Sequence, residues 1–235
     1  MDNGIKCRVS ELPLVEVLNF GRQPLGNGFL RKEEFDDEYF FNMKVGFCEK
    51  SFMLQLIEQP NPSKMFHSEY PFYSSTSKYM DIHFRKLYEK VINSEFVSSK
   101  SPFVVELGCN DGILLKNFSK KGINHLGIEP STNVAEVAKK NGVNVITEFF
   151  NEKLADKIIS KEGKADIFLS ANVMCHIPSI NDVVCGIKKL IKKKGVVIFE
   201  DPYLGDIVRK NSYDQIYDEH VFLFSALSVR NLFQK

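Results

Sequence analysis

A dense group of ionisable and polar side chains lies near the end of the chain. It contains one histidine, two tyrosines and several carboxylates: Tyr213, Asp214, Tyr217, Asp218, Glu219 and His220. An imidazole titrates in the range that suits a general base, and a neighbouring carboxylate can orient it and raise its basicity. The group therefore predicts proton transfer by His220. The alternative is a solvated loop with a core-packed histidine.

A second group of residues has the spacing of a ligand-binding turn. Gly108 and Gly112 follow the apolar run 103–107, and glycine lets the backbone turn tightly and approach a ligand. Glu129 ends the next apolar run, where a carboxylate can accept both hydroxyl hydrogens of a ribose. The turn lacks the G-x-G-x-x-G spacing of a pyrophosphate site, so the pair favours S-adenosylmethionine (SAM) over NAD. A surface glutamate beside a helix N-terminus is the alternative for Glu129.

A third group is the segment SANVMCHIP, residues 170–178. We expect Asn172 to contact the methionyl or adenosyl part of the cofactor. His176 is a candidate catalytic residue, but the more frequent role of a histidine there is loop packing with a backbone hydrogen bond. Cys109 and Cys175 have no obvious base partner and are interpreted as small apolar lining.

The elements that must position these groups alternate from residue 103 onward, as in βαβ units on a parallel sheet. We expect strands at 103–107, 124–128, 144–147, 166–171 and 195–199. Helices are expected at 113–120, from Ser131 as N-cap, at 180–192 and from about 225, with the run Lys192 to Lys194 at a helix end. Ligands of such sheets bind beyond the carboxyl ends of the strands, where all three groups lie. The predicted fold class is α/β.

The N-terminal part has a different texture. Residues 1–60 contain short apolar pieces separated by Gly, Pro and Asn, which predicts a small β-rich module. Residues 61–77 read as a loop and 78–93 as a helix. The predicted division is 1–60, 61–100 and 101–235.

Composition narrows the function classes. The 235 residues are 43% hydrophobic, and 31 basic against 30 acidic side chains give a net charge of +1, which predicts no nucleic-acid surface. No apolar stretch approaches the ~20 residues that cross a bilayer, and the first residues lack a signal sequence. We expect a cytoplasmic protein without membrane contact. The five scattered cysteines are expected to be free thiols.

Taken together, these motifs resemble the sugar C-methyltransferases that act on nucleotide-linked deoxysugars. The resemblance covers essentially the whole chain, and its fold is the Rossmann-like class I SAM methyltransferase domain. The matching segments are PLGNGF at 24–29, YPFYSSTS at 70–77, VELGCNDGILLKNF at 104–118, LGIEPSTNVAEVA at 126–138, SANVMCHIP at 170–178, FEDPYLGD at 199–206 and IYDEHVFLFS at 216–225.

The resemblance implies roles for individual residues. SAM would be held by Glu106, Gly108, Asn110, Gly112, Glu129, Ser131 and Asn172, with Tyr73 and Ser77 in a loop that closes over cofactor and substrate. His220 would remove a proton next to a sugar ketone, and Tyr217 and Glu219 would orient the substrate or relay the proton. The resulting enolate carbon would take the methyl group of SAM.

Two departures from the family pattern bear on these expectations. Relatives bind a structural zinc through two Cys-x-x-Cys pairs, whereas here the pairs read Cys7 with Ser10 and Cys48 with Ser51. Because neutral hydroxyls are weak zinc ligands, we expect no bound metal. The family also continues with further strands and another domain, so we expect either a partner chain or self-association that covers the open sheet edge, or a naturally shortened or degraded version of the enzyme. The alternatives are a sugar O-methyltransferase and a non-catalytic SAM-binding module that needs a partner.

Overall fold

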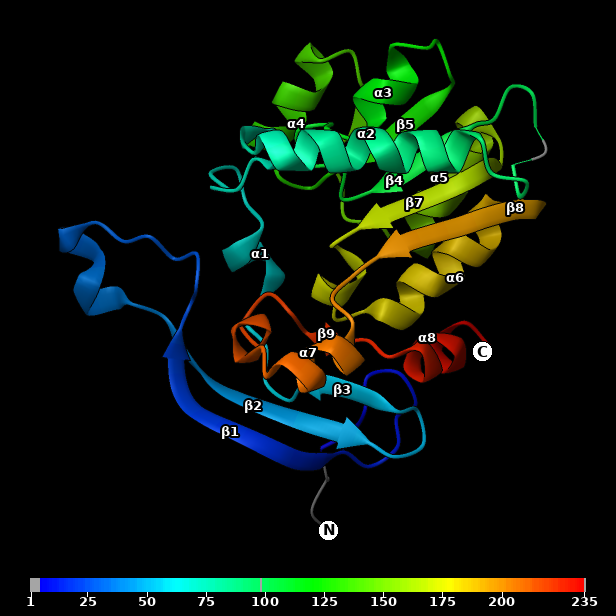
Figure 1. The fold of residues 1–235 in the computed structure, drawn as a ribbon. Coiled ribbons are helices and arrows are strands. Elements are labelled where there is room, and N and C mark those ends of the chain that lie inside the picture. The colour runs from blue at the N-terminus through cyan, green and yellow to red at the C-terminus, as the bar shows by residue number, and fades with distance from the viewer. Residues whose placement is uncertain (1–4, 98, 235) are drawn as a thin grey trace. The chain divides into compact units, whose positions relative to one another are not determined.

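The computed structural model describes residues 5–97 and 99–234, which fall into two units (Figure 1). A parallel unit comprises residues 66–171 and 182–200. An antiparallel unit comprises the residues up to 65 together with 172–181 and those from 201 onward. The chain passes from the parallel to the antiparallel unit after residue 171 and again after residue 200. The residues that follow two neighbouring strands of the parallel unit therefore belong to the antiparallel unit, together with the N-terminal strands. The predicted division into 1–60, 61–100 and 101–235 stays a prediction.

The parallel unit is built on a five-stranded sheet of order β6-β5-β4-β7-β8. Its strands are β4 (Val104–Leu107), β5 (His125–Ile128), β6 (Val145–Ile146), β7 (Ala165–Ala171) and β8 (Ile191–Glu200). Every residue of β4 and β5 is buried, as expected for parallel strands covered on both faces. All pairings are parallel, so the carboxyl ends of β4, β5 and β7 lie along one edge of the sheet.

Helices cover both faces of this sheet. The helices are α2 (Lys78–Ile92), α3 (Leu115–Ser119), α4 (Thr132–Lys140), α5 (Glu152–Glu162) and α6 (Ile180–Leu190). Apolar side chains of α2, α3 and α4 form one core with Ile167 and Leu169 of β7. Phe168 points to the opposite face, where its ring contacts Phe150 at a centroid distance of 5.5 Å just before α5. Gly186 of α6 lies against the same Phe150 ring.

The antiparallel unit contains a four-stranded sheet of order β1-β2-β3-β9. The strands are β1 (Val15–Pro24), β2 (Phe40–Cys48), β3 (Met53–Leu56) and β9 (Phe222–Leu223), and the helices are α1 (Pro62–Met65), α7 (Leu204–Lys210) and α8 (Ala226–Phe233). Short 3-10 helices are η1 (Lys32–Asp37), η3 (Met174–His176) and η4 (Tyr213–Gln215), with η2 (Ser74–Thr76) in the parallel unit. Phe41, Val45 and Leu223 share its core with Ile207 of α7.

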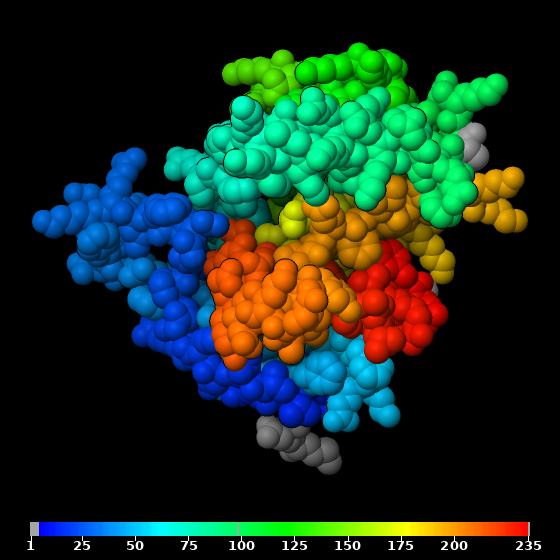
Figure 2. All heavy atoms as spheres, viewed as in Figure 1, coloured from blue at the N-terminus to red at the C-terminus, as the bar shows by residue number. Residues whose placement is uncertain are grey.

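One segment of this unit is unusually exposed. Figure 2 shows the chain around η1 (blue) projecting beyond β1 and β2. Phe29 and Phe35 are 80% and 60% exposed there.

Several sequence predictions needed correction. The run Lys192 to Lys194 was expected at a helix end but lies in β8, because α6 ends at Leu190 and the strand follows without a loop. Helices α5 and α7 and strand β9 were not predicted. The β-rich N-terminal module and the five parallel strands are confirmed, with shifts of a few residues at their ends. Within the described ranges, no helix has the length and apolarity to cross a membrane.

Candidate functional site

The turn after β4 has a backbone that few residues adopt. Gly108, Asn110 and Gly112 have φ values of 68°, 49° and 80°. A Cβ on Gly112 would lie 2.9 Å from Val143 Cγ2 and 3.1 Å from Ala138 Cβ, so glycine is required there by both conformation and space. The sequence predicted the glycines for this reason. The left-handed conformation of Asn110 was not predicted, although asparagine tolerates it best among non-glycine residues.

Three buried carboxylates surround this turn. Glu106, Asp111 and Glu129 are at most 6% exposed, and Glu106 Oε2 and Asp111 Oδ1 accept no hydrogen bond among the described residues. Burial raises the pKa of Glu106 well above its usual value, and the charges of Glu129 and Asp111 raise it further. A cradle of this kind suits a ligand with positive charge and hydrogen-bond donors.

Glu129 is tied to the backbone on both sides. Its Oε2 accepts from the Asn110 N–H at 3.0 Å, and its Oε1 accepts from the Ser131 N–H at 2.9 Å. Burial raises its pKa, although these two N–H groups oppose the shift. Glu129 is thus a buried residue of the turn and not the surface glutamate of the alternative. Ser131 is the N-cap of α4, but its hydroxyl makes no cap hydrogen bond, contrary to the prediction.

The aromatic loop 70–77 is attached to the glycine turn by backbone groups. The Ser74 N–H donates to Asn110 Oδ1 at 3.0 Å, the Ser75 N–H donates to Asp111 Oδ2 at 2.8 Å, and Asn110 Nδ2 donates to the Phe72 carbonyl at 3.1 Å. These contacts were not predicted, because the loop contributes only backbone groups to them, and side-chain patterns do not reveal such groups.

The two loop residues singled out in the sequence have different positions. The Tyr73 hydroxyl accepts from Asn133 Nδ2 of α4 at 3.0 Å. Ser77 is the N-cap of α2, and its hydroxyl accepts from the Met80 N–H at 3.3 Å. Tyr73 therefore belongs to the surroundings of the turn, whereas Ser77 fixes the start of a helix.

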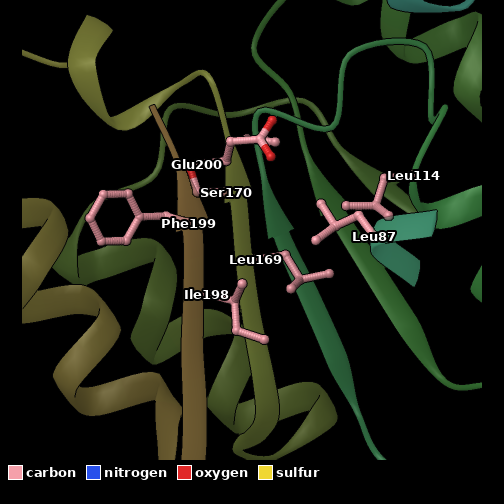
Figure 3. Close-up of a pocket in the computed structure, with 8 residues that line it drawn as sticks. Leu87, Leu114, Leu169, Ser170, Ile198, Phe199 and Glu200 are labelled. Carbon is pink, nitrogen blue, oxygen red and sulfur yellow. The ribbon is translucent and has the colours of Figure 1, made fainter. Parts of the chain in front are cut away.

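A small hollow lies at the carboxyl ends of β7 and β8 (Figure 3). Its volume is about 80 Å³, and its wall combines Leu87, Leu169 and Ile198 with Ser170 and Glu200. The Ser170 hydroxyl is buried without a described partner, and the Glu200 carboxylate contacts His83 Nε2 of α2 at 2.9 and 3.0 Å. Ligands of open α/β sheets bind at this edge.

The proton-transfer group predicted from the sequence lies in the antiparallel unit. His220 Nδ1 lies 2.7 Å from the Gln215 carbonyl, to which it can donate, so Nε2 carries the free lone pair of the neutral ring. The Tyr217 ring lies 4.4 Å from the His220 ring, and the His176 ring meets it edge-on at 5.1 Å. Burial lowers the pKa of His220, and burial with the neighbouring His220 lowers the pKa of His176 to about 3. Both rings are therefore neutral at neutral pH.

The carboxylates beside His220 are held by the N-terminal motif PLGNGF. Asn27 Nδ2 donates to Glu219 Oε1 at 2.6 Å, and the Gly26 N–H donates to Asp218 Oδ1 at 3.1 Å. Glu219 Oε2 lies 3.6 Å from His176 Nδ1. Sequence reasoning assigned no role to Asn27, although its motif was among the segments that carry the resemblance. Asn172, which we expected to contact the cofactor, belongs to the antiparallel unit, and its backbone is left-handed with a φ of 55°.

The two Cys-x-x-Ser pairs converge in the same unit. Cys7 Sγ lies 3.2 Å from Ser51 Oγ, and Cys48 Sγ lies 3.4 Å from Ser10 Oγ. Burial opposes ionisation of Cys48, but hydrogen bonds from Ser10, Ser51 and two backbone groups outweigh it and lower the pKa of this thiol to about 7. Two thiols and two hydroxyls do not fit a tetrahedral zinc site, because neutral hydroxyls bind this ion weakly.

Family models match almost the whole chain. Residues 77–235 match a model described as "Methyltransferase domain", and residues 7–66 match one described as "Putative zinc binding domain".

Curated relatives give the same family. C-methyltransferase NovU of Streptomyces niveus is 30% identical over 233 residues, which are 97% of this chain and 54% of NovU. Ubiquinone biosynthesis O-methyltransferase of Colwellia psychrerythraea is 26% identical over 111 residues, 45% of each chain. This chain thus spans about half the length of these relatives.

Solved structures confirm the predicted fold class. A SAM-dependent methyltransferase from Anabaena variabilis superposes with a TM-score of 0.52 at 18% identity, covering 66% of this chain and 71% of that chain. The plantazolicin methyltransferase BpumL, solved with a pentazolic desmethylPZN analog and SAH, gives 0.53 at 18% identity, covering 68% and 66%. The parallel sheet is that of class I SAM methyltransferases, and with the domain model spanning more than half of its residues, the chain belongs to the SAM-dependent methyltransferase family.

Proposed function

We propose that the parallel unit binds SAM at the turn between β4 and α3. The support is the buried cradle of Glu106, Asp111 and Glu129, in which carboxylate oxygens lack donors. SAM carries a sulfonium, an ammonium and two ribose hydroxyls, so it offers the positive charge and the donors that this cradle suits. BpumL, which shares the fold, was solved with SAH. When bound, SAM supplies an activated methyl group.

We further propose that the reaction is C-methylation of a nucleotide-linked keto sugar. The observation that carries this proposal is the fixed ring of His220, whose Nδ1 is tied to the Gln215 carbonyl and whose Nε2 is free to accept a proton. The likeness to a C-methyltransferase over 97% of the chain supports the same reaction. The choice of a nucleotide-linked sugar as the substrate rests on the resemblance of the sequence to the sugar C-methyltransferases.

In this mechanism His220 Nε2 removes a proton from the carbon next to the ketone. The lowered pKa of His220 keeps the ring unprotonated before the reaction, which a general base requires. Tyr217, beside the ring, is held in its neutral form because burial and the charge of Glu219 raise its pKa, so its hydroxyl can donate to the developing enolate oxygen. Orientation of the enolate carbon toward the methyl group then governs the rate.

O-methylation is the second candidate. The ubiquinone biosynthesis O-methyltransferases favour it, although they align with less than half of this chain. The same His220 would then deprotonate a hydroxyl.

Proton exchange separates the two reactions and tests His220. The full chain is incubated in deuterated water with nucleotide-linked keto-deoxysugars, and deuterium at the carbon next to the ketone is followed by NMR. We expect exchange with the wild-type protein, loss of exchange in His220→Gln, and retained exchange in the matched variant His67→Gln, an exposed histidine. Methyl transfer without deuterium exchange at the carbon next to the ketone would favour O-methylation. Exchange that persists in His220→Gln would contradict the role of this residue.

A further inference from the structure

Three side chains of the antiparallel unit bring metal-binding atoms together at His220. One ring nitrogen of His176, one of His220 and the Sγ of Cys175 lie within 4.8 Å of one another. Among the described residues this is the only group of three or more Cys, His, Asp or Glu side chains with this geometry. The ligands of a tetrahedral zinc ion bound at about 2.0–2.3 Å lie about 3.3–3.8 Å apart, so the three atoms would have to approach one another by up to about 1.5 Å, a shift that side-chain rotations can supply.

The groups around these atoms resemble those that orient the ligands of a metal site through hydrogen bonds. His220 uses one ring nitrogen on the Gln215 carbonyl at 2.7 Å, which orients the ring and leaves the other nitrogen available. Metal-bound histidines are held in this way by a carbonyl or a carboxylate. Glu219 Oε2 lies 3.6 Å from His176 Nδ1, and Asn27 holds the other oxygen of this carboxylate at 2.6 Å. A carboxylate oxygen is thus close by as an orienting group or a fourth ligand.

The donor set selects the kind of ion. One sulfur and two imidazole nitrogens suit zinc and similar transition-metal ions, whereas magnesium and calcium prefer oxygen ligands. The ring nitrogen that would bind the ion is the one that His220 needs to accept a proton. Binding at this place and action of His220 as a base therefore exclude each other.

We propose that Cys175, His176 and His220 form a zinc-class ion site, and that the bound ion blocks the base. The blocking rests on the proposed function, whereas the binding does not. This site is distinct from the two Cys-x-x-Ser pairs, which involve other residues of the same unit. Binding of the ion displaces the thiol proton of Cys175 to solvent and leaves the imidazoles neutral.

Cobalt is the probe for binding, because cobalt bound to a thiolate has a charge-transfer band. We expect the metal-free, reduced full chain to bind one Co²⁺ with this band, and Zn²⁺ to displace it. Cys175→Ser should lose the band, and His176→Gln should weaken cobalt binding by at least about 10-fold, because loss of a group that only orients a metal ligand already costs about that much. Circular dichroism checks that both variants are folded.

Two control variants remove other thiols and so show whether the cobalt band belongs to Cys175. Cys185→Ser removes an exposed thiol, and the double variant Cys7→Ser, Cys48→Ser removes the thiols of the Cys-x-x-Ser pairs. Both should keep the band. A band that survives in Cys175→Ser, a band that disappears in the double variant, or no cobalt binding at all would overturn the proposed site.

Inhibition is measured separately from binding. With a working methyl-transfer assay, zinc should lower the rate of the wild-type protein, and more zinc should be needed for the same fractional loss in His176→Gln, each relative to its own metal-free rate. Equal zinc sensitivity would contradict blocking at this site. If no transfer is found with any substrate, the proposed function fails, and the cobalt result still decides whether the site exists.

Discussion

The side-chain amide of Asn27 donates a 2.6 Å hydrogen bond to the carboxylate of Glu219, 192 residues further along the chain. Asn27 belongs to the glycine-rich segment after β1, and Glu219 directly precedes the proposed base. A second bond of the same kind joins the Gly26 N–H to Asp218. The N-terminal strands therefore carry the loop that fixes the carboxylates beside His220. The N-terminal module is part of the proposed catalytic machinery and not only an appended domain.

Asn27→Asp should impair catalysis without unfolding the protein. The substitution replaces a donor by a second negative charge next to Glu219. A hydrogen bond to a charged group contributes about 1.5–3 kcal/mol, which corresponds to a fall in kcat/KM of roughly 10- to 100-fold. Asn42→Asp is the matched control, since Asn42 makes a similar 2.9 Å bond to the exposed Glu58. Equal rates for Asn27→Asp and Asn42→Asp would contradict a role for the Asn27 contact.

Glu129→Gln should weaken SAM binding. Each carboxylate oxygen of Glu129 accepts from one backbone N–H, and glutamine has only one oxygen for these two donors and for the ribose hydroxyls. The loss of about 1–3 kcal/mol predicts a Kd for SAM that is roughly 5- to 150-fold higher by calorimetry. Glu136→Gln on the exposed part of α4 serves as control. Wild-type affinity in Glu129→Gln would refute the cradle.

The stability contribution of Cys48 should depend on pH. Its folded pKa of about 7 lies below the usual value for a thiol, so the folded state favours the thiolate. The contribution is therefore present above the pKa of the unfolded chain and is lost as pH falls through about 7. The difference in unfolding free energy between wild type and Cys48→Ala should rise from pH 7 to 9 in denaturant titrations. Ser10→Ala, which removes one hydrogen bond, should move the rise to higher pH. A difference that does not change with pH would count against the lowered pKa.

Adding two thiols should create a zinc site in the N-terminal module. Ser10 and Ser51 already lie 3.4 and 3.2 Å from the sulfur atoms of Cys48 and Cys7. The double variant Ser10→Cys, Ser51→Cys would present four thiols where zinc prefers them. Metal analysis should find one more zinc ion per chain than in the parent protein, and Tm should rise with zinc. Unchanged zinc content would show that the four positions do not converge closely enough.

Local patterns in the sequence predicted the parts of the structure that depend on neighbouring residues. The glycines at 108 and 112 could be found because a tight turn after a buried strand requires them, and the acid at 129 because it ends the next apolar run. The alternation of short apolar runs with helical stretches located the five parallel strands. The pattern at Lys192 to Lys194 misled, because charged side chains are equally compatible with a helix end and with an exposed edge strand.

Contacts across long stretches of sequence could not be predicted. No local signal indicates that Asn27 contacts Glu219 or that β9 pairs with β3. The same holds for Ser74 and Ser75, whose backbone N–H groups bind the turn residues. The approach of Cys175 and His176 to His220 also depends on tertiary packing. These contacts join parts of the chain that are distant in sequence, and only the tertiary fold brings them together.

Transfer of an isotopically labelled methyl group tests the central claim most directly. The full chain is incubated with labelled SAM and nucleotide-linked keto-deoxysugars, and NMR identifies the atom that receives the label. C-methylation with His220 as base predicts the labelled methyl group on the ring carbon next to the ketone, and no such product with His220→Gln. A label on oxygen, or SAM binding without any methylated sugar, would contradict it.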